Sequence, residues 1–165
     1  MSLQDTVTKQ YVSDPKVFAD AFNYLIYDGE QVIRPEQLTD LDATQFAIPY
    51  REEEEGKPEA TQKYRDVLKT LAVKTDEYCT YLVLGIENQS NVHYAMPVRN
   101  MLYDAMQYEK QVRQLAATHR KKHDAATSDE YLSGMSREDK ITPVITLVIN
   151  FGSKKWDGPI RLHEM

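Results

Sequence analysis

Apolar residues recur at three- and four-residue spacing in two stretches of the chain, and this spacing predicts two amphipathic helices. The first runs from Asp14 to Tyr27, with Ser13 as its cap, Pro15 in its first turn and its end near Gly29. The second is a long helix from Tyr94 to about Arg120. The apolar stripe that we expect it to bury consists of Val98, Met101, Leu102, Ala105, Met106, Val112, Leu115 and Ala116.

Three further stretches have the composition of strands. Segments 64–75 and 78–89 are rich in β-formers and are separated by the polar pair Asp76-Glu77, so they predict a hairpin. If the hairpin turns symmetrically at that pair, opposed residues have numbers that add to 153. The apolar run from Tyr81 to Ile86 suits a strand covered on both faces, and the run from Thr142 to Phe151 predicts another buried strand.

The remaining stretches predict connections. Segment 30–60 holds three prolines and a run of glutamates, and we expect mostly loop with small strand pieces. Segment 127–140 is polar and charged, which predicts a mobile loop or a short helix. The order helix, irregular region, strand, strand, helix, strand describes an α/β domain with helices layered on a sheet.

Composition narrows the class of protein. The chain has 165 residues, 26 acidic and 20 basic, and a net charge of −6. This length suits one globular domain, and no apolar run approaches the roughly 20 residues of a membrane span, so we expect no membrane association. A lone cysteine and a start without a signal peptide favour a cytoplasmic location. The negative charge argues against unspecific binding of polyanions, although a local basic groove is compatible with it.

Two carboxylates stand out in the predicted hairpin. Glu87 and Gln89 interrupt an otherwise apolar strand, and residues two apart on a strand share one face. In the symmetric register Asp66 faces Glu87, and directly opposed Cβ atoms lie about 4.5–5.5 Å apart. Two ionised carboxylates at that separation repel each other unless a cation such as Mg²⁺ lies between them. The alternative is that Asp66 pairs with Arg65 or Lys69 on an edge strand and that Glu87 caps the following turn.

Several segments resemble one known family over nearly the whole chain. The first are Phe18-Ala19-Asp20-Ala21-Phe22-Asn23, Tyr64-Arg65-Asp66 and Gly85-Ile86-Glu87-Asn88-Gln89-Ser90. The others are the stretch from His93 to Asp104, Pro143 to Gly152, and Trp156-Asp157-Gly158-Pro159. Together they resemble the PD-(D/E)XK nuclease superfamily, in the form found in Rpn-type recombination-promoting nucleases, a transposase-related group.

The resemblance implies a restriction-endonuclease-like core, with a mixed central sheet flanked by helices, and Mg²⁺-dependent hydrolysis of DNA in which Mn²⁺ can substitute. Asp66 and Glu87 would be metal ligands, the carbonyl of Asn88 a further ligand, and Gln89 would take the place of the motif's lysine. That departure matters because a lysine brings positive charge to the reacting phosphate, whereas an amide can only orient a group.

Other residues are candidates with a plain alternative. Asp20 corresponds either to an acidic helix residue that some superfamily members add to the site or to a solvent-facing residue. Arg99 either contacts a phosphate or orients Glu87, or it is a solvated arginine. The best basic patch for a nucleic-acid backbone comprises His119, Arg120, Lys121 and Lys122.

Two functions therefore compete. The first is a metal-dependent DNA endonuclease, and the second is a nucleic-acid-binding or assembly module of the same fold whose catalytic site has decayed, as Gln89 and the net charge suggest. A small-molecule enzyme lacks support because no glycine-rich phosphate loop follows a strand. We expect residues 1–165 to form a single nuclease-like domain, the N-terminal part of a longer protein. A homodimer would suit cleavage of both DNA strands, but no residue specifies its interface.

Overall fold

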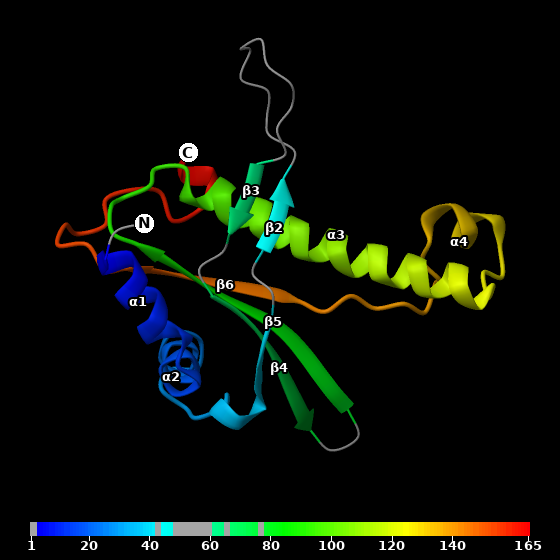
Figure 1. Ribbon diagram of the computed structural model, residues 1–165, viewed down its shortest axis with the longest axis horizontal. Coiled ribbons are helices and arrows are strands. Elements are labelled where there is room, and N and C mark those ends of the chain that lie inside the picture. Colours follow the sequence, from blue (N-terminus) through cyan, green and yellow to red (C-terminus); the bar gives the residue numbers. More distant parts are fainter. Residues whose placement is uncertain (1–2, 42–43, 48–60, 65–66, 76–77) are drawn as a thin grey trace, which may run out of the picture.

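The computed structural model describes residues 3–41, 44–47, 61–64, 67–75 and 78–165 as an α/β domain (Figure 1). Its main sheet has the strand order β1-β4-β5-β6, and β2 and β3 form a separate two-stranded sheet. The helices are α1 (Leu3–Ser13), α2 (Pro15–Ile26), α3 (Met96–Lys122) and α4 (Ser128–Ser133), with 3-10 turns η1 (Pro35–Gln37) and η2 (Leu162–Glu164). The strands are β1 (Leu38–Asp40), β2 (Thr44–Ala47), β3 (Thr61–Tyr64), β4 (Val67–Thr75), β5 (Tyr78–Gln89) and β6 (Val144–Asn150).

The predicted first helix is present as α2, but its cap differs from the prediction. The carboxylate of Asp14 accepts hydrogen bonds from the main-chain N–H of Lys16 at 2.8 Å and of Val17 at 3.4 Å. Ser13 instead ends α1, a helix that the sequence pattern did not predict, and its hydroxyl donates to the carbonyl of Lys9. The prediction of Ser13 as cap was wrong because that residue already belongs to the preceding helix.

The end of α2 is fixed by a turn and by one buried side chain. Asp28 and Gly29 both have positive φ, and the N–H of Gly29 returns to the carbonyl of Asn23. The Asn23 side chain, which is 1% exposed, then bridges to the next segment: it accepts from the N–H of Ile33 at 2.8 Å and donates to the carbonyl of Ile33 at 2.9 Å. Asn23 therefore ties α2 to the chain that leads into β1.

The predicted hairpin is confirmed, including its register. Strands β4 and β5 pair antiparallel from Val67 opposite Ile86 to Thr75 opposite Tyr78, and the two numbers in every pair add to 153. The predicted pair of Asp66 with Glu87 lies outside the described residues, because Asp66 is not described and only the main chain of Glu87 is. Strand β6 is parallel to β5 and closes the sheet as an edge strand, so the sheet is mixed.

Helices cover both faces of this sheet. On one face, α1 and α2 pack on β4, β5 and β6, and the buried core there comprises Val12, Phe18, Ala19, Phe22, Ile33, Val67, Ile86 and Leu147. Side chains alternate along a strand, so Thr146 lies on the opposite face from Leu147. Thr146 donates a hydrogen bond to Asp104 on α3 at 2.7 Å, which places α3 over that second face.

The long helix is confirmed, but its predicted buried stripe is not. The fully buried residues of α3 are Met96, Tyr103 and Gln107, whereas Met101 of the predicted stripe is 53% exposed and Val98 is 40% exposed. The side that meets the sheet is polar.

This polar side covers the edge strand. The hydroxyl of Tyr108 accepts from the N–H of Val144, and Gln111 both accepts from the N–H of Thr142 at 2.5 Å and donates to its carbonyl at 3.0 Å. An edge strand leaves main-chain groups unpaired, and polar side chains of a covering helix can satisfy them. The apolar stripe was therefore the wrong guide to the buried face of α3.

The remaining predictions of secondary structure agree with the described residues, except that Tyr64, predicted to begin the hairpin, ends β3 and pairs with Thr44 of β2. The described part of segment 30–60 contains η1, β1 and β2, and segment 127–140 contains the short helix α4. The last strand is present as β6. Within the described ranges, no helix is both long enough and apolar enough to cross a membrane.

Candidate metal and nucleic-acid site

The candidate site lies where β5 ends. In the parallel pairing with β6, Glu87 stands opposite Val148 and Gln89 opposite Asn150. Gln89 is 9% exposed, and its carbonyl accepts from the N–H of Phe151 at 2.8 Å, so β5 and the chain after β6 stay joined beyond the strand ends. The side chains of Glu87 and Asn88 lie outside what the structure describes.

The segment after β6 packs tightly on the loop after β5. A Cβ atom added at Gly152 would lie 2.4 Å from the carbonyl oxygen of Ser90, so any other residue there would force the two loops apart. Farther on, Tyr94 donates to Asp157 at 3.4 Å, and the indole of Trp156 donates to the carbonyl of Gly158. Four segments that carry the family resemblance thus meet at one end of the sheet.

Arg99 lies near this end, in the first turns of α3. Its Nε donates to the hydroxyl of Tyr103 at 3.2 Å, and its guanidinium carbon lies 5.6 Å from the centre of that ring. Tyr103 is only 2% exposed, and Arg99 itself is half-buried. These contacts argue against Arg99 as a merely solvated arginine and favour a fixed, oriented positive charge.

Asp20 does not join this group. It is exposed on α2, which covers the face of the sheet opposite to α3 and therefore opposite to Arg99. Its position favours the interpretation as a solvent-facing residue.

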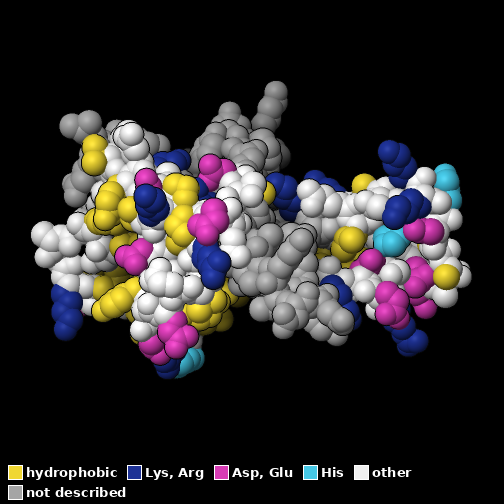
Figure 2. Space-filling model, turned by 90° about the horizontal axis from the view of Figure 1, so that it is seen from below, with side chains coloured by type: hydrophobic (Ala, Val, Ile, Leu, Met, Phe, Trp, Pro, Cys, Tyr) yellow, Lys and Arg dark blue, Asp and Glu magenta, His cyan; other side chains and the backbone are white. Residues whose placement is uncertain are grey.

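The predicted basic patch is at the other end of α3. Twenty residues separate Arg99 from His119 on one helix, which corresponds to about 30 Å at 1.5 Å per residue (Figure 1). Arg120, Lys121 and Lys122 are exposed there, and Figure 2 shows acidic side chains interspersed with the basic ones at this end of the molecule. The structure therefore separates the predicted basic patch from Arg99 and from the end of β5.

His119 is already engaged within the protein. Its Nδ1 lies 2.7 Å from a carboxylate oxygen of Asp124, and its Nε2 lies 2.9 Å from one of Asp139. Both carboxylates raise the pKa of the His119 imidazole above its usual value, with the hydrogen bond to Asp124 as the larger cause. A doubly protonated ring is the form that donates from both nitrogens.

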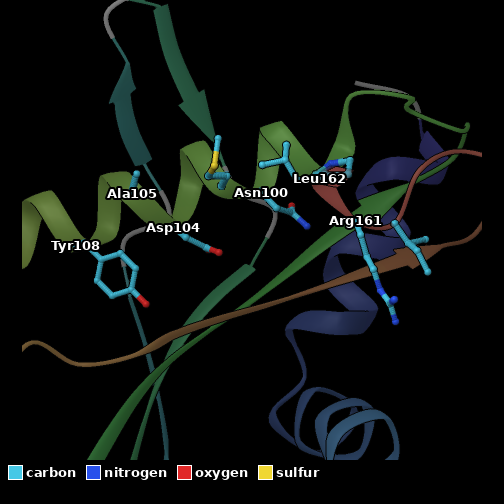
Figure 3. A pocket seen from close by; sticks show the side chains of 9 residues that line it. Asn100, Asp104, Ala105, Tyr108, Arg161 and Leu162 are labelled. Carbon is cyan, nitrogen blue, oxygen red and sulfur yellow. The ribbon is translucent and has the colours of Figure 1, made fainter. Parts of the chain in front are cut away.

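A groove lined by both polar and apolar side chains runs along α3, and the sequence pattern did not predict it (Figure 3). A cavity of about 460 Å³ lies between α3 and the chain end, with Asn100, Asp104 and Tyr108 on the helix and Arg161 and Leu162 opposite. The Oδ1 atom of Asn100 is buried without a hydrogen-bond partner in the described part of the chain. Polar residues at 100, 104, 108 and 111, spaced four, four and three apart, were the signal for this side of the helix.

The predicted metal donors are the carboxylates of Asp66 and Glu87 and the carbonyl of Asn88. Among the described residues, no group of three or more His, Cys, Asp or Glu side chains is placed to hold a metal ion, and Asp66 lies outside those residues. Two carboxylates with a main-chain carbonyl are the hard oxygen donors that Mg²⁺ takes, so the predicted set fits the ion by its chemistry.

Comparison with known proteins gives no assignment: no protein-family model, no curated protein and no solved structure matches the chain.

Proposed function

We propose that the chain is a Mg²⁺-dependent DNA endonuclease with a restriction-endonuclease-like core, in which Asp66 and Glu87 bind the metal. The observation that carries the proposal is the hairpin register. Every described pair of β4 and β5 has numbers that add to 153, and Asp66 and Glu87 have the same sum.

The order of elements supports the same fold. A helix precedes three antiparallel strands, and a second helix then leads to a strand parallel to the third: α2, β1, β4, β5, α3 and β6. This agrees with the mixed sheet, flanked by helices, that the family resemblance implies, and β1 is one of the small strand pieces expected in segment 30–60.

The chemistry follows from the residue types. Asp66, Glu87 and the carbonyl of Asn88 would hold Mg²⁺, which supplies an activated water and stabilises the charge on the phosphate that is cleaved. Gln89 brings an amide that can orient the water or the phosphate by hydrogen bonds. Arg99, held by its stacking on Tyr103, supplies the fixed positive charge that the glutamine lacks.

A decayed binding module is the second candidate, and one observation favours it. Gln89 is buried at the position of the family's lysine, and an amide carries no charge to stabilise a developing phosphorane. In that case the chain would bind nucleic acid without cutting it.

Cleavage of supercoiled plasmid DNA tests the proposal. We expect wild-type protein to nick the plasmid with Mg²⁺ or Mn²⁺ and to stop in EDTA, while Asp66→Asn and Glu87→Gln remove the activity. Glu109→Gln, an exposed carboxylate on α3, is the matched control and should cut normally. Nicking that persists in both site variants, or folded wild-type protein that binds plasmid but never cuts it, would overturn the endonuclease proposal.

A further inference from the structure

The far end of α3 carries a compact polar arrangement that the proposed nuclease does not use. Residues 124–140 leave the helix, form α4 and return beside its last turns on the way to β6 (Figure 1). We call this segment the arm.

One contact of the arm is steric. Gly134 is buried and has φ of +73°, and a Cβ atom there would lie 2.5 Å from the Cβ of Ala116 on α3. The main chain of the arm therefore lies directly against the helix, at a place where only glycine fits both the conformation and the space.

The second contact is His119, which lies between the two ends of the arm. Asp124 precedes α4, Asp139 follows it, and each places a carboxylate oxygen within 2.9 Å of one ring nitrogen. The side chains of His119 and Asp139 are 19% and 14% exposed, so water screens their contact only in part, whereas Asp124 is 41% exposed and its contact is screened more.

We propose that His119 is a proton-dependent clasp, which holds both ends of the arm on α3 as an imidazolium and releases them when it loses its proton. A neutral imidazole has one N–H, so it can donate to only one of the two carboxylates, and its other nitrogen then faces an oxygen lone pair. Release would loosen the arm without unfolding the sheet, because the arm contributes nothing to the buried core on β4 and β5.

The groups around the ring carry both signs: the carboxylates of Asp124 and Asp139 favour a positive ring, and the guanidinium of Arg120 opposes it. The pKa of Glu130 on α4 is lowered chiefly by the hydrogen bonds that its carboxylate accepts from the N–H groups of Ala126 and Arg137, and His119 contributes least. Arg120 and His123, at the end of α3, line a cavity beside the His119 ring. The charged and titratable groups around the ring are Arg120 and His123 at the end of α3, Glu130 and Tyr131 on α4, and Asp124 and Asp139 before and after α4.

The pH dependence has a definite sign. The pKa of His119 is raised in the folded state, so the stabilisation is complete below the ordinary value of 6.5 and is lost as pH rises through the folded pKa. The pKa of Asp139 is lowered, chiefly by the N–H of Ser136, so at acid pH the clasp persists until pH falls through that lowered pKa. The arm should be most firmly held between these two limits.

NMR titration of the histidine rings, combined with hydrogen exchange of the amides at 136–139, tests the proposal on the intact chain. We expect His119 to titrate above 6.5, and the opening constant of the arm to rise tenfold for each unit by which the measured pKa exceeds that of an unpaired histidine. Asp124→Asn is the cleanest variant, because Asp139 also accepts from the N–H of Ser136. It should lower the His119 pKa and raise arm opening at pH 6, whereas Asp129→Asn, an exposed carboxylate on α4, should leave both unchanged.

Two results would overturn the clasp. One is a His119 that titrates at or below 6.5 in the wild type, and the other is arm opening that stays constant while His119 loses its proton. Neither result depends on whether the chain cleaves DNA.

Discussion

Asn23 offers a direct test of how α2 is attached to the sheet. Its side chain satisfies both the N–H and the carbonyl of Ile33, at 2.8 and 2.9 Å, in a place where Asn23 is 1% exposed. Asn23→Ala would leave both main-chain groups buried without a partner, at about 1–3 kcal/mol each. We therefore expect the free energy of unfolding to fall by about 2–6 kcal/mol, a large share of the roughly 5–15 kcal/mol of a typical domain.

Asn23→Asp removes only one of the two hydrogen bonds to Ile33. The carboxylate can still accept from the N–H of Ile33, but its second oxygen replaces the donor that faces the Ile33 carbonyl. Repulsion and burial raise the pKa of the new carboxyl in the folded state, so this variant should regain stability as pH falls from 7 to 5.

Urea unfolding followed by circular dichroism at pH 5 and pH 7 measures both effects. Asn91→Asp, at an exposed position, is the matched control and should change stability little at either pH. Two results would contradict this role of Asn23. One is a loss of unfolding free energy under about 1 kcal/mol for Asn23→Ala, and the other is the same pH dependence of stability in the Asn23→Asp and Asn91→Asp variants.

Two further predictions concern the two faces of the sheet, and urea unfolding checks both. Lys69 is 2% exposed and contacts Asp40, so Lys69→Met should leave the free energy of unfolding nearly unchanged or raise it. Asp40→Ala removes the carboxylate that faces this buried ammonium and should lower the free energy of unfolding by about 1.5–3 kcal/mol. Equal losses in both variants would contradict this role of the pair. Gln111→Ala should lower the free energy of unfolding by about 1–3 kcal/mol, because it removes both hydrogen bonds to the main chain of Thr142. The control Gln114→Ala, at an exposed position on the same helix, should change it by less than about 0.5 kcal/mol. A similar loss in both variants would contradict the role of Gln111.

The sequence predicted the hairpin well because its signals are local. A polar pair between two runs of β-formers predicts a symmetric register, and the described pairs follow it from Val67 with Ile86 to Thr75 with Tyr78. By contrast, α1 was missed, because segment 3–13 holds few apolar residues and their spacing does not mark the buried side. Val7 and Tyr11 stand four residues apart but are exposed, whereas Val12 is buried.

The buried side of α3 was mispredicted for a different reason. Its partner is the edge strand β6 with the residues just before it: Tyr108 and Gln111 pair with main-chain groups of Val144 and Thr142, and Asp104 accepts from the hydroxyl of Thr146. This pairing depends on strand order, which the sequence pattern of the helix does not contain. The role of His119 was hidden in the same way, because Asp139 is twenty residues distant in the chain.

Binding of Mn²⁺, followed by electron paramagnetic resonance, tests whether Asp66 and Glu87 form a metal site. We expect the folded wild-type protein to bind the ion, Asp66→Asn and Glu87→Gln each to abolish the binding, and Asp20→Asn on α2 to leave it intact. Absence of binding in folded wild-type protein, or binding that survives both substitutions, would contradict the metal site and with it the nuclease.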